Sequence, residues 1–399
     1  MFMSRLPPRL LLACLLPLVA APSVQADEAD VFNLRASVAA LRDDNLFRLS
    51  GGQKPRSETI TTTIAGVDVH KRFSLQEFIG QVSWVDTRYA TNDYLNAGSL
   101  QYNGRWLWAV GAHLKGELSA DRASAQNSFA DFQGLRERNL RTTENQRFGA
   151  EYLFHPSWAV IGGVNHVAMR NDKPLLAETD FEATGASLGI KHSPSSGNWF
   201  SFQTRQSDGR YTKRQFSAIN QFDNGFTDRG QEFAVGWQPT GHSTFTGRLE
   251  YFQRHHDHFA SRDFSGWTGL LGYQYQASAK TQLNATYQRG LNAFQDVVNI
   301  NSSYYASDDL IFGIRWDATE KITVGGRLGL THRRYLGEIV PLAGPRREDD
   351  IRRAGVDVSY KPERWLELKA GLAMEKRDST GTVLDYTDRQ ALLSATARF

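Results

Sequence analysis

Apolar and polar residues alternate along most of this chain, in segments of about ten residues. The alternation is clearest in residues 106–117, 244–254, 321–333 and 366–375. A period of two residues places apolar side chains on one face of a strand and polar side chains on the other. We find no run with the 3.6-residue period of an amphipathic helix, so the pattern predicts an all-β protein.

The alternating segments divide the chain into about eighteen strands, an even number that returns both ends to the same side of a membrane. We therefore predict a transmembrane, antiparallel, up-and-down β-barrel. Segments 58–69, 72–88 and 300–317 alternate least clearly, which leaves about sixteen strands as the main alternative. The predicted strands cover residues 31–48, 58–69, 72–88, 94–102, 105–118, 145–154, 157–170, 183–192, 197–206, 230–238, 242–254, 266–276, 279–290, 300–317, 320–334, 350–360, 363–377 and 387–399.

The connections separate this fold from a soluble sandwich, whose strands also alternate. Short turns and longer polar loops follow one another along the chain, which is the asymmetry between the periplasmic and extracellular ends of outer-membrane barrels. Either loop 119–144 or loop 207–229 is long enough to fold inward as a constriction. The predicted turns are residues 102–104, 155–157, 194–197, 239–241, 278–279, 318–320 and 362–363, and the longer loops also include 171–180, 254–263 and 337–349.

Two aromatic patterns support the same orientation. Tryptophan prefers the membrane interface, and six tryptophans lie near short turns, which predicts a girdle on the periplasmic side. The last strand alternates up to Phe399 and ends there, which resembles the signal that the barrel-assembly machinery reads in outer-membrane proteins. The six tryptophans are Trp106, Trp158, Trp199, Trp237, Trp316 and Trp365.

The first residues have the pattern of a secretory signal peptide. Arg5 and Arg9 precede an apolar run of about a dozen residues, too short to span a bilayer as a helix, and small residues lead to Ala26. We predict a cleaved Sec-type signal peptide at residues 1–26 and a single barrel at residues 27–399. The one cysteine, Cys14, lies in the leader, so the mature protein is predicted to have no disulfide.

The predicted excess of positive charge lies on the polar, lumenal face of the strands and not in the chain as a whole. Without its leader the chain is close to neutral, which argues against a nucleic-acid partner. Barrels of about sixteen to eighteen strands are wide enough for an aqueous channel, and here the polar face carries more cations than acids. A basic lumen attracts anions, although the same cations can pair with acids across strands. The lumenal cations singled out are Arg205, Arg248, Arg254, Arg315, Arg327, Arg333, Arg353, Lys369 and Arg377.

Signals for catalysis and metal binding are weak. Residues 185–189 match the Gly-x-Ser-x-Gly pattern of hydrolases, but Ser187 lies within an alternating strand instead of the strand-to-helix turn that the chemistry needs. The histidines of residues 255–258 are contiguous and lie in a predicted exposed loop, so they favour a solvated loop over a metal site. We expect no enzyme activity, no cofactor and no metal.

One short segment resembles a known family. Asp43, Asp44, Asn45, Leu46, Phe47, Arg48 and Leu49 resemble the DDNLFRL segment of the EpsL family, outer-membrane proteins of exopolysaccharide gene clusters associated with exosortases. The resemblance implies that the protein helps an extracellular polysaccharide cross the outer membrane together with other export components. The Asp43 and Asp44 pair has three interpretations: a solvated rim feature, a cation site or an element of barrel closure.

Three functions therefore remain open. The first is a porin-like channel in the outer membrane that takes part in polysaccharide export, the polymer being anionic to suit the basic lumen. The second is a general or small-anion porin. The third is a structural or adhesive barrel that does not conduct.

Overall fold

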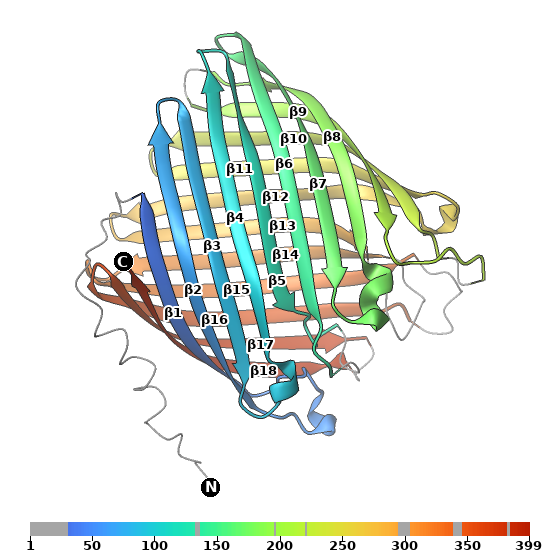
Figure 1. Cartoon of the computed structure of the whole chain (residues 1–399), viewed down its shortest axis with the longest axis vertical. Coiled ribbons are helices and arrows are strands. Elements are labelled where there is room, and N and C mark those ends of the chain that lie inside the picture. The colour runs from blue at the N-terminus through green and yellow to red at the C-terminus, as the bar shows by residue number, and fades with distance from the viewer. Residues whose placement is uncertain are drawn as a thin grey trace.

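A computed structural model describes residues 31–131, 136–194, 197–219, 222–293, 304–337, 345–380 and 384–399. Eighteen antiparallel strands form one sheet that closes on itself through the pairing of β1 with β18, and Figure 1 shows the resulting barrel. The prediction of eighteen strands is confirmed and the alternative of sixteen is wrong. The predicted signal peptide at residues 1–26 lies outside the described residues and stays a prediction.

The strands follow one another around the barrel in chain order. Their bounds are β1 (Phe32–Asp43), β2 (Glu58–Phe73), β3 (Gln76–Tyr89), β4 (Ala97–Val110), β5 (Leu114–Gln126), β6 (Leu140–His155), β7 (Trp158–Asn171), β8 (Phe181–His192), β9 (Trp199–Tyr211), β10 (Gly225–Thr240), β11 (Ser243–His256), β12 (Phe264–Ser278), β13 (Thr281–Ala293), β14 (Tyr304–Asp317), β15 (Ile322–Leu336), β16 (Glu348–Glu363), β17 (Leu366–Ser379) and β18 (Tyr386–Arg398).

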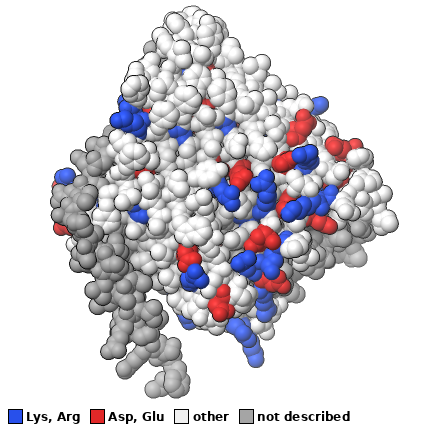
Figure 2. All heavy atoms as spheres, in the orientation of Figure 1, with Lys and Arg blue, Asp and Glu red and all other residues white. Residues whose placement is uncertain are grey.

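The outer wall is apolar because every second residue of each strand points to lipid. Leu188, Leu328 and Leu372 are each more than half exposed, which is the state of a side chain facing a bilayer in the absence of lipid. Figure 2 shows this wall as a large uncharged area, with charged side chains gathered toward the strand ends that carry the longer loops. Ion pairs in that charged region include Arg122 with Glu144 and Arg210 with Glu182.

The connections have the predicted asymmetry. Residues 74–75, 156–157, 241–242 and 279–280 form tight turns at one end, and longer connections carry short 3-10 helices at the other. These helices are η1 (Gly51–Gln53), η2 (Asp93–Leu95), η3 (Pro174–Thr179) and η4 (Ala260–Arg262), and none of the described helices is long and apolar enough to cross a bilayer.

The predicted turn at residues 102–104 is wrong. Asn103 and Gly104 lie inside β4, and the chain turns at residues 111–113, where Gly111 adopts a positive φ of 62°. Val110 pairs with Leu114 across this turn, so even-numbered residues face lipid both before and after it. The alternation therefore runs through the true turn unbroken, which is why residues 106–117 resembled one strand.

Strands extend further toward the loops than the sequence indicated. The loops predicted at residues 119–144 and 207–229 are shorter, because β5 and β6 leave only residues 127–139 between them and β9 and β10 leave only 212–224. The longer strands lift the loop end of the barrel above the height that a bilayer requires, about ten residues per strand.

Candidate functional site

The lumenal wall carries the cations predicted from the sequence. Arg327 lies next to Leu328, which is 58 % exposed on the lipid side, so the two side chains point to opposite faces of β15. The same parity places all nine predicted cations on the lumenal face: Arg205, Arg248, Arg254, Arg315, Arg327, Arg333, Arg353, Lys369 and Arg377.

Most of these cations are paired with lumenal acids. Arg254 binds Asp228 through two hydrogen bonds of 2.7 Å, and Lys369 Nζ lies 3.0 Å from Asp357. The other ion pairs are Arg205 with Glu250, Arg248 with Glu232, Arg315 with Asp317 and Arg353 with Glu375. The pairing across neighbouring strands that the sequence left open is therefore present, and the free positive charge of the wall is smaller than the count of cations suggests.

Two exposed lumenal arginines have no side-chain partner within the described part of the chain. Arg147 on β6 and Arg327 on β15 are exposed and make no hydrogen bond or ion pair with a described residue. Arg147 faces the lumen because its neighbour Phe148 is exposed to the lipid side and stacks there on Trp108. Arg147 was missing from the predicted lumenal set, although the alternation of residues 145–154, with Phe148, Tyr152 and Phe154 on the apolar face, would have placed it there.

A loop crosses the lumen. We call residues 127–131 and 136–139, between β5 and β6, the crossing loop. Asp131 lies 3.2 Å from Arg333 on β15, and the Ala130 carbonyl accepts a 2.7 Å hydrogen bond from Arg377 on β17. Because β15 and β17 lie on a different part of the wall from β5 and β6, the loop narrows the passage. Of the two loops that the sequence offered as a constriction, the first, residues 119–144, contains the segment that folds inward.

The segment that resembles the EpsL family holds the crossing loop in place. Phe47 packs edge-on against Phe129, with ring centroids 5.0 Å apart, and Arg136 lies over the Phe47 ring. Both phenylalanines belong to a buried apolar cluster with Leu46, Leu49, Tyr89 and Leu95. We call residues 44–57, which connect β1 to β2, the first loop.

The same segment closes the barrel at the junction of β1 and β18. The Asp44 carboxylate accepts a 2.7 Å hydrogen bond from the Arg389 amide, and Asn45 Nδ2 donates to the Thr387 carbonyl. Asn45 also caps its own loop, because its amide group bonds the amide and carbonyl of Leu49. Among the three interpretations of the aspartate pair, the observed contacts favour barrel closure.

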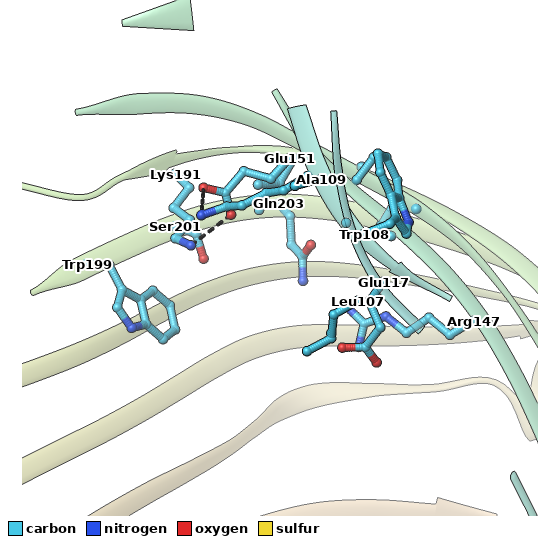
Figure 3. Close-up of a pocket in the computed structure, with 18 of the residues that line it drawn as sticks. Leu107, Trp108, Ala109, Glu117, Arg147, Glu151, Lys191, Trp199, Ser201 and Gln203 are labelled. Atoms are coloured by element: carbon cyan, nitrogen blue, oxygen red, sulfur yellow. Dashed lines mark hydrogen bonds and ion pairs between the residues drawn. The ribbon is translucent and has the colours of Figure 1, made fainter. Parts of the chain in front are cut away.

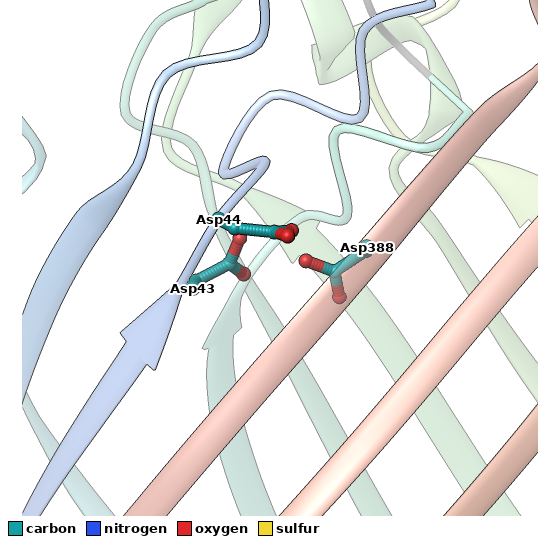
Figure 4. Close-up of side chains that lie close together, drawn as sticks. All are labelled: Asp43, Asp44 and Asp388. Atoms are coloured by element: carbon teal, nitrogen blue, oxygen red, sulfur yellow. The ribbon is translucent and has the colours of Figure 1, made fainter. Parts of the chain in front are cut away.

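Three carboxylates meet at this junction. Asp43, Asp44 and Asp388 each offer an oxygen within 4.8 Å of the others, and Figure 4 shows Asp388 on β18 facing the pair at the end of β1. Arg48 neutralises part of the charge, because its guanidinium lies 3.0 Å from Asp43 and 3.1 Å from Asp388. Burial disfavours the charged guanidinium, but the two aspartates raise the pKa of Arg48 above its ordinary value. Among the described residues, this is the group of carboxylates with the spacing of a metal site.

A hollow of about 700 Å³ opens in the lumen toward the short turns. In Figure 3, Lys191, Glu151 and Ser201 lie together with Trp199 beside them, and Arg147, Glu117 and Leu107 lie across the hollow. Lys191 Nζ lies 2.9 Å from Glu151, and Gln203 donates a 2.7 Å hydrogen bond to Glu232. Trp199 is therefore not part of the lipid-facing girdle that the sequence predicted.

The remaining candidates have other surroundings. Ser187 lines the same hollow, and no described histidine lies beside it as the hydrolase pattern would need. His255 pairs with Asp263, while His258 Nδ1 lies 3.0 Å from Asp223 in the neighbouring loop. These histidines thus bind different carboxylates and tie the loops together.

Comparisons with known proteins agree with this architecture. No family model and no curated protein matches the chain. Among solved structures, OccK2 (OpdF) of Pseudomonas aeruginosa is similar at a TM-score of 0.52 and 11% identity, covering 92% of this chain and 97% of its own. OpdK of the same organism, crystallised with vanillate, is similar at 0.51 and 10%, covering 92% and 99%. OccK2 in complex with glucuronate gives 0.50 and 12%, covering 92% and 98%.

At these identities the likeness shows the fold. The chain is a closed antiparallel β-barrel with the fold of these outer-membrane porins, integral to the Gram-negative outer membrane.

Proposed function

We propose that the barrel is a porin-like channel for small anionic solutes. The observation that carries this proposal is the pair of exposed, unpaired arginines, Arg147 and Arg327, in a lumen narrowed by the crossing loop. Fixed positive charge on the wall of a narrow polar passage attracts anions and repels cations. The similar structures fit this proposal, since vanillate and glucuronate, held by OpdK and OccK2, are both carboxylates.

Ion selectivity in planar bilayers tests the proposal. Across a potassium chloride gradient, the reversal potential of the wild-type channel is expected to have the sign of chloride selectivity. Replacing both arginines, Arg147→Gln and Arg327→Gln, is expected to move it toward the non-selective value. The matched control is Arg352→Gln, because Arg352 pairs with lipid-facing Leu330 and lies outside the lumen. Cation selectivity would refute the proposal, and absence of current would favour a structural or adhesive barrel.

Polysaccharide export is the second candidate, and the DDNLFRL segment is what favours it. Residues 43–49 form the contacts that close the barrel and hold the crossing loop, so the resembling residues lie at the point that controls the passage. In this proposal an anionic polysaccharide passes the lumen with the help of other export components. A deletion strain that traps polymer in the periplasm would support it, and normal surface polysaccharide would reject it.

A further inference from the structure

The hollow near the short turns contains the side chain of Trp199. Anchoring at the membrane interface does not explain a tryptophan that faces the lumen. Trp199 begins β9, and the next residue on that strand, Phe200, is exposed to lipid, so the indole points inward. A tryptophan in an aqueous lumen leaves apolar surface in contact with water, which costs free energy unless a ligand covers it.

The wall is shaped to hold this indole. Trp199 pairs with Gly236 on β10, and a Cβ added to Gly236 would lie 2.3 Å from the indole nitrogen. Any larger residue at position 236 would therefore push the ring away from the wall. Because Gly236 has no side chain, the indole of Trp199 can lie against β10 at this place in the hollow.

Polar groups surround the ring with both signs of charge. Lys191 Nζ lies 5.7 Å from the ring centroid and also 2.9 Å from Glu151. Gln203, Glu232 and Ser201 line the same hollow and offer hydrogen-bond donors and acceptors for hydroxyl groups. Arg147 lines the opposite side of the hollow, so Lys191 is the cation beside the ring.

We propose that this hollow is a binding site for a pyranose sugar that carries a carboxylate, a uronic acid. The apolar C–H face of the ring packs on Trp199, the hydroxyl groups bond Gln203, Ser201 and Glu232, and the carboxylate meets Lys191. This inference rests on the proposed passage of small anions and names the class of anion.

Equilibrium binding in detergent micelles tests the site, with three probes measured by titration calorimetry. Glucuronate is expected to bind about tenfold more tightly than glucose, which lacks the carboxylate, and than acetate, which lacks the sugar ring. Equal affinity for glucuronate and acetate would overturn the proposal, because the indole would then contribute nothing.

Two variants act on the ring by different routes. Trp199→Leu removes the indole, and Gly236→Ala displaces it while leaving every polar group of the hollow in place. Each is expected to weaken glucuronate binding by about tenfold and to leave acetate binding unchanged. Trp237→Leu is the matched control. Trp237 follows Gly236 on β10, but its side chain faces lipid and is half exposed.

Unchanged glucuronate affinity in both ring variants would overturn the site. The reversal potential is recorded without sugar, so failure of anion selectivity and failure of sugar binding give separate results. Glucuronate binding that depends on Trp199 supports this inference even if the channel shows no anion selectivity.

Discussion

Arg48 is a single residue that connects the first strand of the barrel, β1, with the last strand, β18. It has a positive φ of 56°, a backbone conformation that costs a non-glycine residue about 1 kcal/mol. The cost is offset by its contacts with Asp43 and Asp388, which are almost completely buried and would otherwise repel each other. The strained position is therefore a consequence of the charge that the junction has to neutralise.

Replacing this arginine leaves the buried carboxylates without a cation. Arg48→Met is expected to lower the free energy of unfolding by about 3 kcal/mol, as measured by urea unfolding in micelles. Arg42→Met is the matched control, because Arg42 is exposed and, among the described residues, its side chain bonds only the hydroxyl groups of Thr59 and Ser57. A similar small effect for both variants would show that Arg48 is not needed to neutralise the junction.

His258 and Asp223 join two neighbouring loops in a pH-dependent way. The hydrogen bond to Asp223 raises the pKa of His258. Burial opposes ionisation of Asp223, but the bonds from His258 and from backbone amides hold the pKa of Asp223 below its ordinary value. The contribution of His258 is thus complete below its ordinary pKa of 6.5 and is lost as pH rises through the raised value. The contribution of Asp223 is present above its ordinary pKa of 3.8 and is lost as pH falls through the lowered value.

Hydrogen exchange reports on this contact, because the amides of His258 and Phe259 both donate to Asp223. After correction for intrinsic rates, these amides are expected to exchange faster at pH 8 than at pH 6. The other charged groups that act on this pair are Asp257, Arg214 and Arg262. In His258→Gln the difference between the two pH values is expected to disappear, and a difference that persists would assign the effect to another group.

Strands could be predicted from the sequence because lipid outside and water inside impose alternation on every one of them. The positions of the turns were less certain, since Asn103 and Gly104 resemble a turn but continue β4. The three-residue turn at residues 111–113 keeps even-numbered residues on the lipid face in both strands, so the alternation of apolar and polar residues continues through it. The packing of the crossing loop against the opposite wall could not be predicted, because its contact residues Asp131 and Arg333 are 202 positions apart in the chain.

The crossing loop depends on a small number of polar contacts with the opposite wall. Asp131→Asn removes the charge that faces Arg333 and Arg377, which lie 3.2 and 3.7 Å away. The loss of about 1.4 kcal/mol is expected to raise the population of wider conductance states about tenfold in single-channel recordings. Asp93→Asn is the control, because no described residue bonds the Asp93 side chain. Identical recordings for the two variants would show that the loop does not limit the current.

For the molecule as a whole, the sequence predicted a basic lumen, and the charge that remains free depends on pairing. The acids that neutralise Arg248, Arg254 and Lys369 lie on neighbouring strands, directly opposite the cation or two residues from that position, so these pairs follow from register. Register is set by the turns, which is the part of the pattern that the sequence specified least. Arg147 and Arg327 are therefore distinguished from the other cations only once the sheet is assembled.

The closure of the barrel depends on the last residue as well as on the loop end. Phe399 exchanges two backbone hydrogen bonds with Leu34, of 2.7 and 2.8 Å, and its ring stacks on Trp365. If Phe399 is also the assembly signal, its deletion is expected to reduce the amount of barrel in the outer membrane of cells far more than Phe399→Tyr does. The purified deletion variant is expected to refold in detergent with only a small loss of stability, about 1–2 kcal/mol, because the rest of the β1–β18 pairing remains. Loss of refolding in detergent would instead make Phe399 a structural requirement of closure, because an isolated protein has no assembly machinery to read a signal.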